Sequence, residues 1–186
     1  MFIPTKAVSI LLAFLAVGFA SPTPGLVAAG NTVMINSATD FCMIAPSKMR
    51  TPILVSDLPS EAQSYCSEST DPQDRLPYFW INGPPTLDKG EGARGLPYIQ
   101  LTGCINPDAF DHLDPNDHGG QYYSGGESGE PGNPIGSSCT GYNYYVECID
   151  PAAHLAGIRC CQDSVDCPTN RLLEGCKEVI RGNYPC

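Results

Sequence analysis

Cysteine spacing constrains this chain more than any other feature. Of its ten cysteines, seven lie in the stretch from Cys139 to Cys186, and two of those, Cys160 and Cys161, are adjacent. Neighbouring side chains on a strand point to opposite faces, and a disulfide between neighbours would close a small, strained ring. Each of the two is therefore expected to bond to a different partner, so that one strand is held on both of its faces.

All ten cysteines are predicted to form disulfides, because an even number in an exported chain is typical of an oxidised framework rather than of thiols or zinc ligands. The pairing itself is not readable from the sequence. Only three cysteines precede the C-terminal stretch, so at least four of its seven must pair among themselves. The ten are Cys42, Cys66, Cys104, Cys139, Cys148, Cys160, Cys161, Cys167, Cys176 and Cys186.

The N-terminus predicts export. Residues 1–20 carry one positive charge, an apolar run and small residues before SPTP, which is typical of a secretory signal peptide. The run is too short for a membrane span, which needs roughly 20 residues. Residues 21–30 are predicted to be a flexible leader, and residues 31–186 a single domain. The protein is therefore expected to be secreted and extracellular, with no membrane span.

The charge balance excludes one class of partner. Twenty acidic residues outnumber ten basic ones, for a formal net charge of −10. Nucleic acids and anionic membranes need a positive surface. The sequence therefore predicts no nucleic-acid partner.

Alternating apolar patterns predict a mainly β fold. Residues 32–46 form two apolar runs around a turn-forming NSATD and are expected to make a hairpin. Residues 96–105, 142–149 and 157–162 are each predicted to be a strand. We expect a compact disulfide-rich domain, sandwich or barrel-like, with short helical turns and a long Gly/Asp-rich loop.

Five other segments carry weaker patterns. A short helical turn is expected within residues 56–73, where Ser60 could cap it, and another near residues 169–174. The aromatic run at residues 76–81 is predicted to be a buried strand, and residues 177–181 a last strand. Residues 82–95, rich in Gly and Pro, are expected to form a surface loop.

The long loop is expected to span residues 106–138. Loops of this length are uncommon and often functional. Interleaved carboxylates and imidazoles within it could bind Ca²⁺ or a transition metal, but the same Asp-Pro and Asn-Asp pairs are ordinary turn formers, and the spacing departs from the EF-hand pattern. The candidate metal ligands are Asp111, His112, Asp114, Asp117 and His118.

Aromatic residues are the second group of candidates. Tyrosine and tryptophan suit recognition faces because they bury area while keeping a polar tip. A buried position in the core is the competing interpretation, for Trp80 above all. The candidate binding residues are Trp80, Tyr122, Tyr123, Tyr142 and Tyr144.

Several strings together resemble a known family. DFCMIAP, GLPYIQLTGCINPD, DHGGQYY, SCTGYNYYVECIDP and GIRCCQDSVDCPTNRLLEGC are similar to segments of small secreted cysteine-rich proteins of fungi. The most specific piece is the adjacent Cys160 and Cys161 followed by Asp-Cys-Pro at residues 166–168. The resemblance implies secretion and an effector-like or cell-surface role, and it carries no catalytic residues.

The sequence therefore favours a secreted, non-enzymatic protein that needs no cofactor and acts on an extracellular protein or a cell-wall glycan. A cell-wall glycan-binding module is the first alternative. A metal-dependent or carboxylate-based hydrolase is the second, with acid pairs such as Asp111 and Asp114 or Glu127 and Glu130. No nucleophile motif of the Gly-x-Ser-x-Gly kind supports a serine hydrolase, and we predict no catalytic residue.

Overall fold

The computed structural model describes residues 30–56, 58, 60–125, 132–171 and 174–186. The predicted signal peptide and all but the last residue of the predicted leader lie outside these residues. The described part contains nine strands, three single 3₁₀ turns and one four-residue helix. The strands are β1 (Thr32–Ile35), β2 (Phe41–Pro46), β3 (Ala62–Cys66), β4 (Thr86–Glu91), β5 (Pro97–Cys104), β6 (Gly120–Tyr123), β7 (Ser138–Cys139), β8 (Tyr144–Asp150) and β9 (Leu155–Cys161). The helical elements are η1 (Ile53–Val55), η2 (Pro107–Ala109), η3 (Ser164–Asp166) and α1 (Cys176–Val179).

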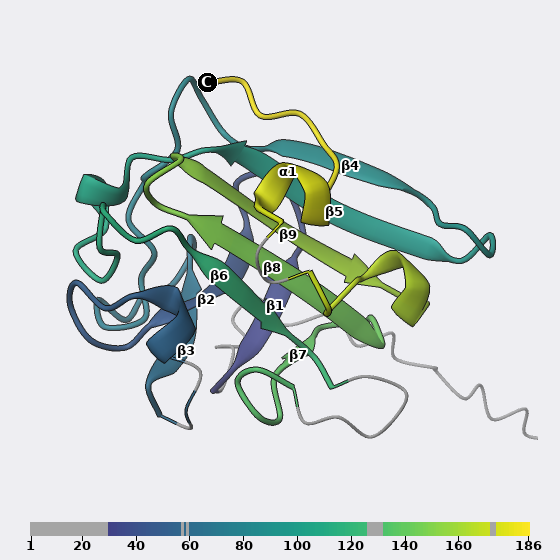
Figure 1. Cartoon of the computed structure of the whole chain (residues 1–186), viewed down its shortest axis with the longest axis horizontal. Helices are drawn as coiled ribbons and strands as arrows, with labels where there is room; N and C mark the ends of the chain where they lie inside the picture. Colours follow the sequence, from purple (N-terminus) through teal and green to yellow (C-terminus); the bar gives the residue numbers. More distant parts are fainter. Residues whose placement is uncertain (1–29, 57, 59, 126–131, 172–173) are drawn as a thin grey trace, which may run out of the picture.

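Two sheets share one hydrophobic core, which confirms the predicted mainly β, disulfide-rich fold. The first sheet has the order β3-β2-β1-β7, with β1 and β7 parallel. The second has the order β4-β5-β9-β8-β6, and all of its pairs are antiparallel. The four-stranded sheet lies behind the five-stranded one in Figure 1, so the arrangement is a sandwich.

The central strands of the larger sheet are buried on both faces. In β8, Tyr145 and Ile149 belong to the core between the sheets, while Val146 and Cys148 belong to a second cluster on the opposite face. That opposite face is covered by α1, which lies in front of the sheet in Figure 1. Because successive side chains of a strand point to opposite faces, β8 contributes apolar side chains to both clusters.

Five disulfides hold these layers together, and the adjacent cysteines behave as predicted. Cys160 bonds to Cys139 in the other sheet, whereas Cys161 bonds to Cys167 just beyond its own strand. The remaining bridges are Cys42–Cys66 between β2 and β3, Cys104–Cys186 from β5 to the C-terminal residue, and Cys148–Cys176 from β8 to α1. Strand β9 is thus tied on both faces, and six of the seven C-terminal cysteines pair among themselves.

The predicted hairpin and the three predicted strands are present, as β1–β2, β5, β8 and β9. Two segments expected to be loops contain edge strands. Within residues 82–95, β4 pairs along its whole length with β5, and within residues 106–138, β6 pairs with β8. An edge strand draws its stability from a partner's backbone groups and needs little apolar alternation of its own. That is why neither strand left a clear sequence pattern.

Other local expectations were wrong. The segment after Ser60 forms β3 rather than a helical turn, and the first part of the predicted last strand, residues 177–179, belongs to α1. In the described part of residues 169–174 there is no helix. Residues 76–81 are extended but join no sheet beyond one bridge between Trp80 and Ile105. The predicted burial is confirmed for Leu76, Phe79 and Trp80, which all lie in the core, but not for the exposed Tyr78.

Candidate ligand-binding pocket

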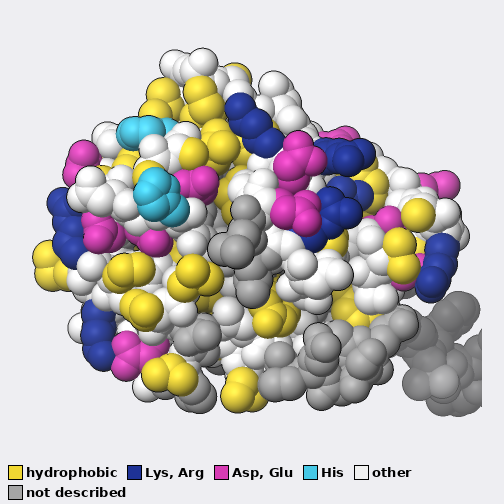
Figure 2. Space-filling model, in the orientation of Figure 1, with side chains coloured by type: hydrophobic (Ala, Val, Ile, Leu, Met, Phe, Trp, Pro, Cys, Tyr) yellow, Lys and Arg dark blue, Asp and Glu magenta, His cyan; other side chains and the backbone are white. Residues whose placement is uncertain are grey.

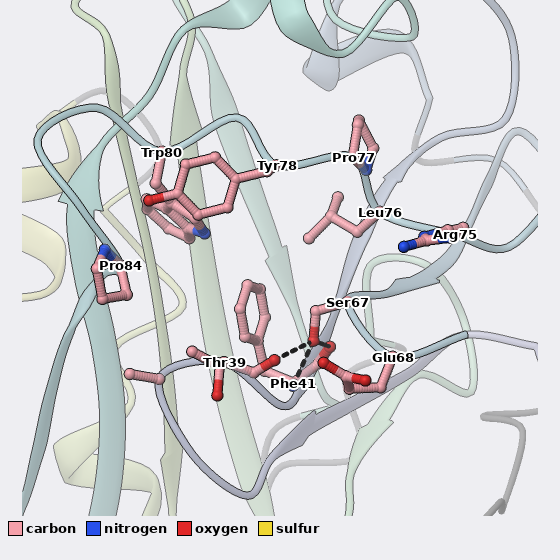
Figure 3. A pocket seen from close by; sticks show the side chains of 11 residues that line it. Thr39, Phe41, Ser67, Glu68, Arg75, Leu76, Pro77, Tyr78, Trp80 and Pro84 are labelled. Carbon is pink, nitrogen blue, oxygen red and sulfur yellow. Dashed lines mark hydrogen bonds between the residues drawn. The ribbon is translucent and has the colours of Figure 1, made fainter. Parts of the chain in front are cut away.

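A pocket of about 390 Å³ opens at one edge of the sandwich, and we name it the Trp80 pocket (Figure 3). Its walls come from three parts of the chain that are far apart in sequence: the turn before β2, the residues after β3, and the extended segment with Pro84. The lining residues are Ala38, Thr39, Phe41, Ser67, Glu68, Arg75, Leu76, Pro77, Tyr78, Trp80 and Pro84.

Aromatic rings form the apolar walls of this pocket. Phe41 and Trp80 are both buried and meet edge to face, with ring centroids 6.0 Å apart. Tyr78 is 67% exposed and completes the aromatic wall near the opening. Trp80 can lie this close to β5 because residue 103 is glycine: a Cβ there would come within 2.8 Å of the indole. Close approach of a ring to a strand is a common reason for glycine in a strand interior.

The indole N–H of Trp80 has no hydrogen-bond partner among the described residues. Trp80 is only 6% exposed, and Figure 3 shows its ring nitrogen on the side that faces the pocket. Buried donors are almost always paired, because an unpaired one costs roughly 1–3 kcal/mol. The nitrogen is closed to solvent in this conformation, so a ligand would reach it only after a shift of the wall.

Polar groups rim the pocket on its other side. Ser67 fastens the turn before β2, since its Oγ accepts from the Phe41 N–H at 3.0 Å and donates to the Thr39 carbonyl at 2.9 Å. Glu68 and Arg75 are exposed, and the described residues place no opposite charge within 4.0 Å of either. Both side chains are therefore free to contact a ligand.

A second hollow of about 400 Å³ adjoins the first, and we name it the His112 pocket. It is more polar than the Trp80 pocket and shares two of its lining residues. The residues that line it are Tyr65, Pro72, Gln73, Arg75, Pro77, Asp108, Ala109, Phe110, Asp111 and His112. The two hollows thus meet at Arg75 and Pro77.

The structure brings only one of the predicted binding aromatics to a pocket. Trp80 lines the first pocket, whereas the four candidate tyrosines line neither. Tyr122 has no exposed surface, and its hydroxyl bonds to the Ser56 hydroxyl within the core. Tyr142 packs against the main core and Tyr144 against the second cluster. The strand predicted to begin at Tyr142 begins only at Tyr144, after a turn at Gly141.

Sequence reasoning missed most of the pocket residues. Tyr78 lies two positions before Trp80, and in an extended chain such residues share a face, so the aromatic run contained a usable signal. No sequence pattern marked Phe41, Glu68 or Arg75 as pocket residues. They reach the pocket through the pairing of β2 with β3 and through the backbone β-bridge between Cys66 and Arg75.

Several of the predicted metal ligands bond to backbone groups, some of them far away in the sequence. Asp117 accepts from the Ile53 N–H at 2.8 Å, and Asp114 accepts from the Asn116 N–H at 3.0 Å. His112 Nδ1 lies 2.9 Å from the Tyr65 hydroxyl. Among the described residues no three His, Cys, Asp or Glu side chains are grouped to hold a metal. Histidine and acidic side chains do lie near one another on the face shown in Figure 2, and His118 is exposed.

Asp111 and His112 are the predicted ligands that the structure keeps together. Asp111 Oδ1 lies 3.8 Å from His112 Nε2, and both residues line the His112 pocket. The acid pair Glu127 and Glu130 lies outside the described residues.

Glu147 is the one carboxyl buried wholly between the sheets, among the residues described. Its Oε2 accepts from the Ile44 N–H in the opposite sheet at 3.0 Å, and its Oε1 has no partner. Burial raises the pKa of Glu147 well above its usual value, and the bond from Ile44 offsets this only in part. Glu147 lines neither pocket. Its role is structural: it supplies an acceptor to a backbone group that strand pairing leaves free.

Comparison of the chain with family models, with curated proteins and with solved structures finds no match. No helix in the described ranges has the length and apolar character needed to cross a bilayer.

Proposed function

We propose that this chain is a secreted, non-enzymatic binding protein that acts outside the cell, in an effector-like or cell-surface role. The export signal predicted in residues 1–20 supports secretion, and five disulfides suit an oxidising compartment.

The ligand that the Trp80 pocket suits best is a sugar ring of a cell-wall glycan. The observation that carries this proposal is an aromatic wall facing a rim of hydrogen-bonding and charged groups. Pyranose rings present C–H groups on their faces, which pack against the negative face of an aromatic ring, and hydroxyls on their edges. A hydroxyl oxygen that accepts the Trp80 N–H would also satisfy the one unpartnered donor of the wall.

Binding to chitin, β-glucan and cellulose tests this proposal. Retention of the wild-type protein on one of them is expected, with affinity lowered about tenfold in Trp80→Phe, which keeps an aromatic ring but removes the donor. Tyr78→Ala is expected to weaken binding as well, because it removes the exposed part of the wall. Tyr123→Ala is the matched control, since Tyr123 lines neither pocket.

Two results would count against a glycan ligand in this pocket. Loss of binding in the control variant alone would place recognition on the tyrosines of β6. Failure of the wild type to bind any glycan would leave an extracellular protein as the partner. The hydrolase alternative remains a prediction, and hydrolysis of a glycan that is abolished in Asp111→Asn would support it.

A further inference from the structure

The two pockets share one wall, which the chain holds firmly in place. Arg75 and Pro77 line both hollows. Between them Leu76 is 4% exposed and anchors the segment in the core. Its N–H donates to the Cys66 carbonyl at 2.9 Å, and the Cys66 N–H donates to the Asp74 carbonyl at 2.8 Å. We name residues 75–77 the ridge. Because these contacts hold its backbone in place, the ridge is a fixed wall between the two hollows.

The hollows on either side of the ridge offer different chemistry. The Trp80 pocket has aromatic walls, whereas the His112 pocket is lined by Gln73, Asp108, Asp111 and His112. A ligand that occupies both must therefore be longer than one ring and carry polar groups at the end that enters the second hollow. A short oligosaccharide has this form.

Arg75 supplies a positive charge at the crossing point. Four other basic side chains of the described part, Lys48, Arg50, Arg94 and Arg171, each lie within 3.3 Å of a carboxylate. Arg75 has no such partner among the described residues, as is also true of Lys89, Arg159, Lys177 and Arg181, but of the described lysines and arginines it is the one that lines either pocket. Figure 3 shows its guanidinium turned toward the Trp80 pocket. Guanidinium groups pair well with planar carboxylates.

The acidic residues define where a ligand carboxylate can sit. Glu68 lies in the first pocket, and Asp108 and Asp111 lie in the second. Like charges repel, so a ligand carboxylate is disfavoured deep in either hollow and favoured at the ridge between them. The ligand is then acidic at one defined position rather than along its whole length.

We propose that the Trp80 pocket, the ridge and the His112 pocket form one groove for an oligosaccharide that contains a uronic acid, with its carboxylate paired to Arg75. This inference rests on the proposed function, since it names the ligand class of the same site.

The test compares an acidic trisaccharide with its methyl ester, which has the same rings but no charge. Isothermal titration should show the free uronate bound roughly two- to fivefold more tightly, which is the range for an exposed ion pair. In Arg75→Gln the two ligands should bind equally. Arg181→Gln removes an exposed arginine that lines neither pocket, and it should keep the preference. Added salt should reduce the preference of the wild type.

A second comparison tests the extension into the His112 pocket. Gln73→Ala should weaken binding of the trisaccharide and leave the monosaccharide unaffected, because Gln73 lines only the second hollow. Equal affinity for acid and ester in the wild type, with Trp80→Phe still weakening both, would overturn this inference and leave the proposed function standing. No binding of any saccharide would overturn both.

Discussion

Replacing Glu147 with glutamine tests the central feature of the core. The Glu147 carboxyl is fully buried in β8, and the Ile44 N–H of the opposite sheet donates to it at 3.0 Å. Burial raises its pKa well above 4.5, so the folded protein keeps a proton that the unfolded chain has already released. Glutamine can accept the same bond from Ile44 through its amide oxygen, and it has no proton to lose.

The magnitude follows from proton linkage. From about pH 4.5 up to the raised folded pKa, the folded state holds one more proton than the unfolded state. The free energy of unfolding therefore falls by about 1.4 kcal/mol for each pH unit in this window. The stabilisation is fully present below the unfolded pKa and is lost as the pH rises. The glutamine variant should lack this loss, so its advantage over the wild type should grow by about 1.4 kcal/mol per pH unit.

Urea unfolding with the disulfides intact measures this difference. Curves at pH 5, 6 and 7 for the wild type and Glu147→Gln should diverge steadily, whatever constant offset the buried amide group adds. Glu178→Gln is the matched control for loss of one acidic side chain, because Glu178 is exposed on α1. Parallel stability curves for the wild type and Glu147→Gln would show that the carboxyl is not held neutral between the sheets.

Two further predictions concern the scaffold. Replacing both cysteines of the Cys104–Cys186 bridge by serine should lower the free energy of unfolding by about 4.5 kcal/mol, because this bridge closes a loop of 82 residues. The same replacement at Cys161–Cys167, which closes a loop of 6 residues, should lower it by only about 2 kcal/mol. Equal losses in urea titrations would contradict the explanation by loop entropy. Gly103→Ala should displace the Trp80 ring, which its Cβ would approach to 2.8 Å, and cost roughly 1–3 kcal/mol. An unchanged fluorescence spectrum of the single tryptophan would show that the ring had not moved.

Local patterns predicted those parts of the fold that depend on near neighbours. Strands β5, β8 and β9 could be predicted from the sequence, because the alternation of apolar and polar residues along a strand determines which side chains enter a core. The same alternation could have identified Glu147, which shares a face with Tyr145 and Ile149, as a buried carboxyl. The edge strands β4 and β6 were not visible, because their stability comes from partners elsewhere in the chain.

The candidate site was predictable only in part, since Trp80 was named but its surroundings were not. Phe41, Glu68 and Arg75 come from different segments, and their convergence depends on strand pairing and on a single backbone bridge. Conversely, the Asp and His residues of the acidic loop are close together in the sequence and were therefore predicted as possible metal ligands. In the folded chain its side chains are directed to separate backbone partners, as Asp114 and Asp117 show.

The sequence by itself determined the disulfide-rich character of this protein and the separate partners of Cys160 and Cys161, because both follow from covalent geometry and from the two faces of a strand. The tertiary structure decided which cysteines meet, where a carboxyl is buried, and that Trp80, Arg75 and Phe41 surround one pocket. Those outcomes depend on contacts between residues far apart in the chain, and no local pattern encodes the register that brings them together.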